Sequence, residues 1–309
     1  MLTISFIIPA YNEENNICAT IDSIAKYVPD GYQYEIIVID NGSTDNTCDM
    51  VKYSLAQLLS CPNQTISYLR NFGQKSCFGE LLVFVDGDIL LTETWGKNIN
   101  KVFEDLKINP NTITGSRVLP TDKTTWLNKY WFMKLLDYDA PYINSGHLIT
   151  TKILFEKISG FDESLVTAED YDFCMRGKQA GARLYNDKNI PVLHCGYPKT
   201  INNFIHRERW HGRQDFQTTS SFLDSKVAII AALNLTLFGL AIALFFVYQQ
   251  VLAVGLYIAL MGVISVCLSV FKFGLMKPVV LMNTASIFFI YIWGRSLALV
   301  DRFLPWNRK

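Results

Sequence analysis

The fold of this chain is indicated by one stretch, which reads Leu81-Leu-Val-Phe-Val-Asp86-Gly-Asp88. The five consecutive apolar residues predict a strand that is buried on both faces, as in a parallel sheet. Two carboxylates follow it directly, and Gly87 between them leaves room for a bulky ligand to approach the backbone. In an extended chain alternate side chains point the same way, so Asp86 and Asp88 are expected to share a face. Such a pair suits Mg²⁺ or Mn²⁺ bridged to a diphosphate.

Polar residues also follow two earlier apolar runs. Ile4–Pro9 leads into Ala10-Tyr-Asn-Glu13, and Tyr34–Asp40 leads into Asn41-Gly-Ser-Thr-Asp45. Ligands of open α/β sheets bind outside the carboxyl ends of the strands, so the three strand ends together predict one site. Turn chemistry explains each stretch taken alone, because Asp-x-Asp is common in turns and Asp40 before Gly42 fits a turn cap.

Short β-rich runs and helical stretches alternate over the first part of the chain. Residues 66–69 predict a further strand, and helices are predicted at 14–27, 46–59, 95–106, 129–136 and 167–180. This alternation argues for βαβ units and a mostly parallel sheet, and therefore for an α/β domain over residues 1–222. Lys+Arg and Asp+Glu both total 28, so the charge balance gives no support for nucleic-acid binding.

The last part of the chain is strongly apolar. Residues 227–271 contain no Asp, Glu, Lys or Arg. A helix of about 20 apolar residues spans a bilayer, so residues 227–247 and 251–271 predict a membrane hairpin. Residues 279–299 fit a third span, but Arg295 interrupts it, and a charge at that depth is costly unless it snorkels or has a partner. We therefore expect an all-α transmembrane domain of two to three helices over residues 223–309.

Three stretches resemble the motifs of glycosyltransferase family 2. They read Ser5-Phe-Ile-Ile-Pro-Ala-Tyr-Asn-Glu-Glu14, Glu35-Ile-Ile-Val-Ile-Asp-Asn-Gly-Ser-Thr-Asp-Asn-Thr47 and Phe84-Val-Asp-Gly-Asp88. Further on, Gly160-Phe-Asp-Glu163 followed by Glu169-Asp170 resembles the acceptor-side region of that family. The resemblance covers about residues 1–213 in order and spacing, and the apolar tail indicates a membrane-anchored member. It implies a GT-A fold, which is Rossmann-like, a nucleoside-diphosphate-sugar donor and inversion at the anomeric carbon.

The resemblance also implies which residues bind the donor. Pro9, Tyr11 and Glu13 would line the pocket of the base and ribose, and Asp40 would accept a hydrogen bond from the base. The chemistry agrees, because a carboxylate can read a ring N–H of uracil or guanine. Asp86 would contact the donor as well.

The metal ligands implied are Asp88 and Asp86. His194 follows the strand-like Ile190-Pro-Val-Leu193, and some GT-A enzymes place a downstream histidine near the metal. A structural histidine is an equal alternative at this position.

Asp170 is the candidate base, with Glu169 as its helper. Inverting transfer needs a carboxylate opposite the leaving diphosphate, where it deprotonates the attacking hydroxyl. The structural alternative is a capping box over Thr167-Ala-Glu-Asp170 at the start of a helix. Gly146, within Asn144-Ser-Gly146, resembles the acceptor-side loop of the family, where a glycine allows close approach.

A basic segment precedes the first apolar run and reads His206-Arg-Glu-Arg-Trp-His-Gly-Arg213. Arg209-Trp210 resembles the end of the Gln-x-x-Arg-Trp motif of processive polysaccharide synthases, although His206 stands at the glutamine position. We expect Arg207 or Arg209 to steer a lipid-linked phosphate and Trp210 to anchor at the interface. A patch attracted to anionic lipid is the simpler alternative. The apolar runs predict a multi-pass protein of the cell (inner) membrane. By the positive-inside rule, the basic residues before the first run predict that the catalytic domain is cytoplasmic.

The sequence therefore predicts an enzyme, a glycosyltransferase that moves one sugar with inversion from a nucleoside diphosphate onto a polyprenyl phosphate or lipid-linked saccharide. Mg²⁺ or Mn²⁺ would be its cofactor, in glycan or polysaccharide biosynthesis. One alternative is a processive synthase, for which two or three spans are too few unless a homo-oligomer supplies more. The other is a non-catalytic nucleotide-sugar-binding membrane protein, which predicts damage to the metal or base positions, yet Asp86, Asp88 and Asp170 are present.

Overall fold

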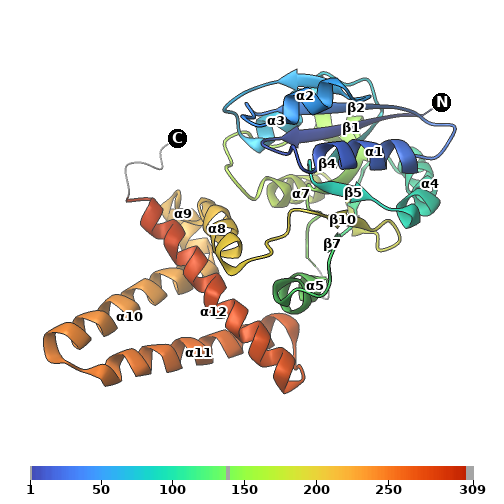
Figure 1. Cartoon of the computed structure of the whole chain (residues 1–309). Coiled ribbons are helices and arrows are strands. Elements are labelled where there is room, and N and C mark those ends of the chain that lie inside the picture. Colours follow the sequence, from blue (N-terminus) through green and yellow to red (C-terminus); the bar gives the residue numbers. More distant parts are fainter. Residues whose placement is uncertain (1, 137–139, 304–309) are drawn as a thin grey trace. The chain divides into compact units, whose positions relative to one another are not determined.

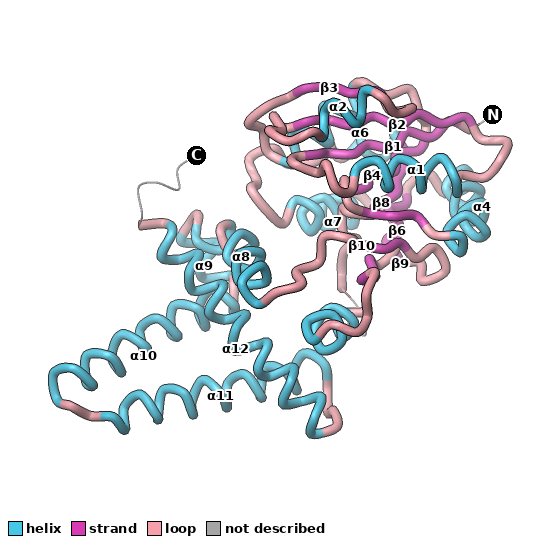
Figure 2. Tube along the Cα trace, in the orientation of Figure 1, coloured by secondary structure: helices cyan, strands magenta, loops and turns pink. Residues whose placement is uncertain are grey.

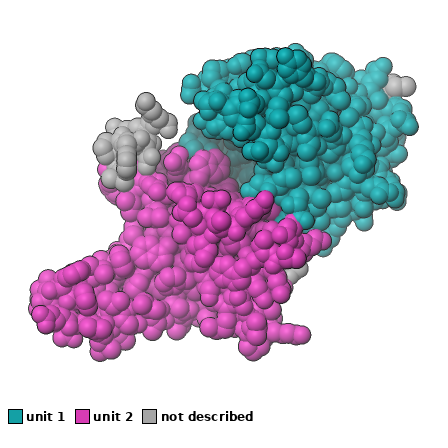
Figure 3. All heavy atoms as spheres, in the orientation of Figure 1, with its two compact units in different colours: residues 1–121, 139–196 teal, residues 122–138, 197–309 magenta. Residues whose placement is uncertain are grey.

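A computed structural model describes residues 2–136 and 140–303 of the chain (Figure 1). It divides into two compact units, residues 1–121 with 139–196 and residues 122–138 with 197–309 (Figure 3). The contacts thus divide the chain differently from the expected boundary between residues 222 and 223. The reason is that segments from before that boundary pack on the apolar helices.

A seven-stranded sheet forms the centre of the first unit, in the order β3-β2-β1-β4-β8-β6-β9. The strands are β1 (Thr3–Ala10), β2 (Gln33–Asp40), β3 (Gln57–Ser60), β4 (Leu81–Val85), β6 (Thr112–Gly115), β8 (His147–Thr151) and β9 (Arg183–Asn186). Only β8 runs against its neighbours, and the other six strands run in one direction. Their carboxyl ends therefore meet at one edge, which confirms the mostly parallel α/β sheet.

A second, three-stranded sheet has the order β5-β10-β7, formed by β5 (Ile89–Leu91), β10 (Val192–His194) and β7 (Val118–Pro120). β10 runs antiparallel to β5, with His194 opposite Ile89. This pairing places His194 beside Ile89, the residue that directly follows Asp88.

Helices cover both faces of the large sheet (Figure 2). They are α1 (Ile17–Tyr27), α2 (Thr47–Lys52), α3 (Ile66–Lys75), α4 (Glu93–Ile108), α6 (Lys152–Lys157) and α7 (Glu169–Gln179). Alternate residues of β1 point to opposite faces, so Phe6 and Ile8 pack with α1 and α4 while Ile7 packs with α3, α6 and α7. Both faces of the strands are buried, as the continuous apolar runs predict.

The prediction of a strand at residues 66–69 is wrong. They form the first turn of α3, which begins because Thr65 Oγ1 accepts a hydrogen bond from the Tyr68 backbone N–H at 3.2 Å. Gly73 of α3 lies so close to Ile7 and Ile39 that a Cβ would stand 2.6 and 2.7 Å from their side chains. Tertiary packing on the sheet therefore selects the helix.

Other predicted boundaries also shift. The helix predicted over residues 46–59 ends at Lys52, and β3 takes up its last residues. The helix predicted at 14–27 begins at Ile17, and that predicted at 167–180 begins at Glu169. Residues 129–136 fall in a π-helical turn (Asn128–Phe132) followed by α5 (Met133–Leu135).

Among its described residues, the second unit contains three helices that are long and apolar enough to cross a membrane: α10 (Lys226–Tyr248), α11 (Val251–Phe273) and α12 (Pro278–Asp301). In Figure 1, α10 and α11 form the expected hairpin. Asn234 of α10 joins all three helices, because it donates to Ser296 Oγ at 3.0 Å and accepts from the Tyr257 hydroxyl at 2.8 Å. Interhelical hydrogen bonds of this kind stabilise helix bundles in lipid.

Arg295 interrupts the apolar pattern of α12, and it has partners. Its guanidinium contacts Glu208 Oε2 of α8 (Ile201–His211) at 3.2 Å and Asp215 Oδ2 at 3.3 Å. A short 3₁₀ turn (Gln214–Phe216) carries Asp215, and α9 (Thr219–Asp224) follows it. Pairing with two carboxylates offsets the cost of the buried charge, so α12 keeps the length of a span.

Candidate active site

The loops after β1 and β2 are joined by hydrogen bonds at the carboxyl edge of the sheet. The Thr44 backbone N–H donates to Asn12 Oδ1 at 2.8 Å, and the Glu13 backbone N–H donates to Thr47 Oγ1 at 2.8 Å. Asn12 adopts φ 55°, a left-handed conformation that asparagine tolerates. The first two motifs of the sequence therefore form one continuous surface.

Asp40 is buried at the end of β2. Its carboxylate accepts hydrogen bonds from the Gly42 and Ser43 backbone N–H groups at 2.9 and 3.1 Å. This is the turn cap that sequence chemistry offered as the alternative to base recognition. Nearby, Pro9 is buried in β1, and Tyr11 in the following loop is 56% exposed.

Asp86-Gly-Asp88 forms a turn between β4 and β5, in which the Ile89 backbone N–H donates to Asp86 O at 3.1 Å. The expected extended conformation is therefore wrong, although the two carboxylates remain close enough that the charge of Asp86 raises the pKa of Asp88. The absence of a side chain at Gly87 leaves room for Glu13, because a Cβ at Gly87 would stand 3.1 Å from Glu13 Cγ. The glycine thus lets a third carboxylate approach the pair.

Burial and charge repulsion shift the pKa of Asp88 and of Glu13. Burial, then the charge of Asp86, raises the pKa of Asp88 from 3.8 to about 7. Burial raises the pKa of Glu13 to about 7, with the charges of Asp88 and Asp86 adding to it. Such a concentration of negative charge at a strand end is costly without a cation, and perturbed carboxylates of this kind mark candidate functional sites.

The surroundings of Asp88 come from β10 and the residues after it. His194 Nε2 lies 3.6 Å from Asp88 Oδ2, and the Cys195 backbone N–H donates to Asp88 O at 2.9 Å. The Gly196 backbone N–H also bonds the carboxylate, and a Cβ at Gly196 would collide with it. The structure therefore brings His194 to Asp88, as the metal-ligand prediction requires.

The donor set fits a hard divalent cation. Among the described residues no three His, Cys, Asp or Glu side chains form a closed metal site. Mg²⁺ and similar ions typically take one or two carboxylates and complete their coordination with water and substrate phosphates. Asp88, with Asp86, supplies such an incomplete oxygen set, to which a diphosphate would add the remaining ligands.

Arg70 of α3 is fully buried and joins two predicted site residues. Its Nη2 lies 2.7 Å from Asp86 Oδ1, and its Nη1 lies 2.7 Å from Glu169 Oε1. Its guanidinium also stands 5.6 Å from the ring centroid of Phe161. Sequence reasoning missed this residue, because the pattern at residues 66–69 predicts a strand. The available signal for a helix was Thr65, a residue type that caps helices, followed by Ile66, Leu69 and Gly73 at helical spacing.

Glu169 and Asp170 begin α7 and have different environments. Glu169 Oε1 accepts from Arg70 and, at 3.1 Å, from Ser145 Oγ, so its charge is compensated. Asp170 Oδ2 accepts a hydrogen bond from the side-chain amide of Asn144 at 3.2 Å. Burial, together with the charge of Glu169, raises the pKa of Asp170. A buried carboxylate with raised proton affinity suits a base better than one held by an arginine.

The capping-box alternative for Asp170 is not formed. Ala168 occupies the N-cap position with φ 64°, and its side chain makes no cap hydrogen bond to any described residue. One turn later on the same helix, Arg176 Nη2 lies 2.6 Å from Asp172 Oδ2.

Asn144-Ser-Gly146 connects the two ends of the site. Asn144 bonds Asp170, Ser145 bonds Glu169, and Gly146 lies against Asp86, where a Cβ would stand 2.9 Å from Asp86 Oδ2. The predicted close approach at Gly146 is thus an approach of the Asp86 carboxylate.

Arg207 and Arg209, predicted to steer a lipid phosphate, and Trp210, predicted to anchor at the interface, lie in the second unit, on α8. Arg209 Nε donates to Asp301 Oδ2 of α12 at 2.6 Å, and Arg207 pairs with Glu208 at 2.6 Å. Trp210 is 39% exposed. Arg209 thus stabilises the packing of α8 on α12, and Arg207 and Trp210 are the more accessible of the set.

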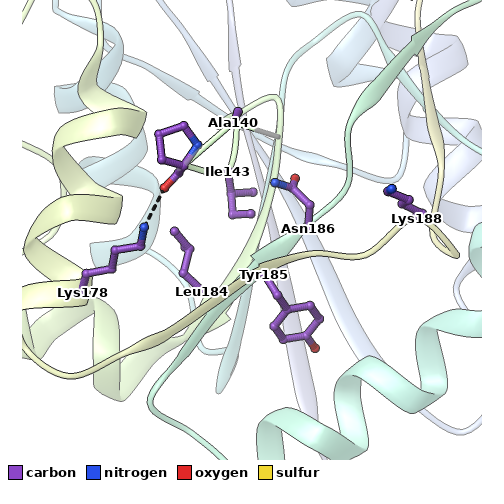
Figure 4. A pocket seen from close by; sticks show the side chains of 8 residues that line it. Ala140, Ile143, Lys178, Leu184, Tyr185, Asn186 and Lys188 are labelled. Atoms are coloured by element: carbon purple, nitrogen blue, oxygen red, sulfur yellow. Dashed lines mark hydrogen bonds between the residues drawn. The ribbon is translucent and has the colours of Figure 1, made fainter. Parts of the chain in front are cut away.

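A separate cavity of about 380 Å³ lies beside β9 (Figure 4). Lys178, Lys188 and Asn186 supply its polar lining, and the Lys178 ammonium donates to Pro141 O at 3.1 Å. None of the predicted site residues lines it.

Comparison with known proteins identifies the family of the chain. The family model described as glycosyl transferase family 2 covers residues 5–165, slightly more than half of the chain. The glycosyltransferase AglE of Haloferax volcanii is 34% identical over 98 residues, which cover 30% of this chain and 32% of that relative. The chain thus matches about a third of the length of this relative.

Two further proteins cover more of the chain. The Escherichia coli enzyme named UDP-Glc:alpha-D-GlcNAc-diphosphoundecaprenol beta-1,3-glucosyltransferase WfgD is 26% identical over 209 residues, 63% of this chain and 74% of the relative. The structure of the mannosyltransferase PcManGT from Pyrobaculum calidifontis, in complex with GDP-Man and Mn²⁺, is 18% identical and has a TM-score of 0.62. That match covers 99% of this chain and 88% of the other, and it shows the same GT-A fold. The chain has a GT-A fold and, among its described residues, three apolar C-terminal helices, and it belongs to glycosyl transferase family 2.

Proposed function

We propose that this glycosyltransferase moves a sugar from a nucleoside diphosphate onto a lipid-linked acceptor at a membrane, with inversion and with a divalent cation. The observation that carries the proposal is the arrangement around Arg70. One buried arginine joins a carboxylate of the strand-end pair to the residue beside Asp170. These contacts support the proposal, because they connect the proposed cation-binding carboxylates to the helix start that carries the proposed base.

Asp170 is the proposed base. Its carboxylate is held by the Asn144 amide at 3.2 Å and by the Tyr171 backbone N–H at 2.8 Å, which fixes its orientation. Burial raises the pKa of Asp170, so this residue takes a proton from a hydroxyl more readily than an ordinary aspartate does. Glu169 pairs with Arg70, and its negative charge adds to the raised pKa of Asp170.

Asp88 and Asp86 are the proposed ligands of Mg²⁺ or Mn²⁺, with His194 at the edge of the same group. A bound divalent cation neutralises the charge that develops on the leaving diphosphate. Among the described residues no arginine or lysine lies within ion-pair distance of Asp88, so a cation there would offset a charge that no basic side chain balances. Pro9, Tyr11, Glu13 and Asp40 remain the proposed surroundings of the base and ribose.

The acceptor proposal rests on the apolar helices and on the relatives. The name of the Escherichia coli relative specifies a diphosphoundecaprenol acceptor. Three helices here are long and apolar enough to hold the protein in a bilayer, where encounters with a lipid substrate are frequent. Arg207 and Trp210 are proposed to meet the lipid phosphate and the interface, respectively.

The orientation proposed for the membrane follows the positive charges. Lys199, Arg207, Arg213 and Lys226 precede α10 or begin it, and Lys272 and Lys277 lie at the end of α11 and just before α12. Short segments rich in Lys and Arg stay in the cytoplasm, which favours a catalytic unit on that side and the Gln249-Gln250 turn outside.

The experiment is a panel of nucleotide sugars offered to the purified protein. UDP-, GDP- and dTDP-sugars are each incubated with Mn²⁺ and with phospholipid vesicles that contain or lack a polyprenyl phosphate or a polyprenyl-diphosphate-linked sugar. Nucleotide release is measured. We expect release from one donor class, dependent on both Mn²⁺ and the lipid acceptor. Equal release in EDTA, or no dependence on the lipid, contradicts the proposed function.

A further inference from the structure

Arg70 is a fully buried ionised group of the catalytic unit, and its two partners come from opposite ends of the site. Asp86 follows β4, whereas Glu169 begins α7, and each contact measures 2.7 Å. Arg70 Nε has no acceptor among the described residues, so these two carboxylates and the ring of Phe161 hold the guanidinium. Charge-assisted bonds of this length fix the positions of both partners.

The contacts form a closed ring. Glu169 accepts from Ser145, the Asp86 backbone N–H donates to the carbonyl oxygen of the next residue, Gly146, at 3.4 Å, and the Asp86 carboxylate returns to Arg70. Asn144, at the other end of that tripeptide, bonds Asp170. A displacement of Asp86 is therefore transmitted to the segment and to the helix start that position Asp170.

The charges around Arg70 predict how a change at Glu169 affects Asp86. Arg70 carries one positive charge against the two negative charges of Asp86 and Glu169. If Glu169 becomes neutral, the whole positive charge of Arg70 acts on Asp86 and competes there with a divalent cation. Lysine cannot replace the arginine, because one ammonium replaces two separate N–H donors that point to different carboxylates.

We propose that Arg70 is a positioning residue that couples the ion-binding carboxylate Asp86 to the start of α7 and thereby to Asp170. The proposal rests on the function proposed above. In that function, Arg70 contacts neither the donor sugar nor the acceptor hydroxyl. Its effect is to make the affinity for the cation depend on Glu169, a residue that does not itself bind the ion.

The test measures Mn²⁺ binding by electron paramagnetic resonance on the purified full chain, without donor or acceptor. Glu169→Gln keeps an oxygen to accept from Arg70 and Ser145 but removes the charge. We expect its Mn²⁺ affinity to fall by about fivefold or more, the low end of ordinary coupling between sites. The matched control is Glu163→Gln. Glu163 accepts from Asn71, the neighbour of Arg70 on α3, at 2.8 Å and is not bonded to Arg70, so its loss should leave Mn²⁺ affinity unchanged.

Arg70→Lys adds a second measurement, in which we expect kcat to fall and the Mn²⁺ concentration for half-maximal activity to rise together. If this variant does not fold, Glu169→Gln still decides the question. Mn²⁺ affinity in Glu169→Gln equal to that in Glu163→Gln overturns the coupling and leaves Arg70 a structural residue. If the native protein binds no Mn²⁺ and releases no nucleotide from any donor, the proposed function fails instead, so the two failures are distinguishable.

Discussion

Replacing Asp88 by asparagine removes the carboxylate that the structure places under the greatest electrostatic stress outside α7. The side chain is 13% exposed, and burial with the charge of Asp86 raises the pKa of Asp88 from 3.8 to about 7. The folded protein therefore holds the proton more tightly than the unfolded chain does. By linkage, the ionised form costs stability as pH rises from about 4 to about 7, and the cost is constant above that range.

The size of this cost follows from the shift. One pKa unit corresponds to about 1.4 kcal/mol, so a shift of about three units costs about 4 kcal/mol at pH 8 and less than about 2 kcal/mol at pH 5. The asparagine side chain carries no charge and keeps an oxygen that accepts from the Gly196 backbone N–H. Without metal, Asp88→Asn should thus unfold at a temperature several degrees higher than the native protein at pH 8, with a smaller difference at pH 5.

The assay is thermal unfolding of the detergent-solubilised protein at pH 5 and pH 8, with EDTA or with Mn²⁺. Mn²⁺ should stabilise the native protein and have little effect on Asp88→Asn, whose turnover should fall by orders of magnitude. Asp49→Asn is the matched control, because Asp49 is exposed and its ion-pair partner among the described residues is Lys52 on the surface. If Asp88→Asn is no more stable than Asp49→Asn in EDTA at pH 8, the electrostatic strain assigned to the metal site is refuted.

Three further predictions concern the base and the membrane. Asp170→Asn should lower kcat by roughly 10²–10⁴ with the donor KM little changed, whereas Asp172→Asn on the same helix should stay near the native rate in steady-state assays. Because the base must be ionised and burial raises the pKa of Asp170, activity should fall with decreasing pH well above the ordinary aspartate range; a pH–rate profile that stays flat down to about pH 4, near the ordinary aspartate pKa, would exclude Asp170 as the base. In a variant lacking the native cysteines, Gln249→Cys should react with a membrane-impermeant reagent in intact cells, and Leu275→Cys only after permeabilisation; the reverse pattern would invert the proposed topology.

The strand ends of the site could be predicted from sequence because their signal is local. Ile4–Pro9, Tyr34–Asp40 and Leu81–Val85 are mostly apolar runs that favour a strand covered on both faces, and each is followed by polar residues at the sheet edge. The apolar tail is equally local, and three helices of sufficient length occur there.

The connections within the site could not be predicted, because they join residues far apart in sequence. Arg70 is 16 residues from Asp86 and 99 from Glu169, and its own helix begins with an apolar turn that fits a strand equally well. Arg295 likewise finds Glu208 and Asp215 at separations of 87 and 80 residues. The prediction that Asp86-Gly-Asp88 is extended was wrong for a related reason. Pairing of β5 with β10 turns the chain immediately after β4.

Activation of a membrane-bound acceptor by Asp170 is the central claim. Its most direct measurement follows a radiolabelled sugar from the active nucleotide donor into the lipid phase of polyprenyl-phosphate vesicles, with native protein, Asp170→Asn and Asp172→Asn compared. We expect label in the lipid with the native protein and with Asp172→Asn, and almost none with Asp170→Asn. Equal transfer by Asp170→Asn, or label that appears only as free sugar in water with the native protein, would contradict the claim.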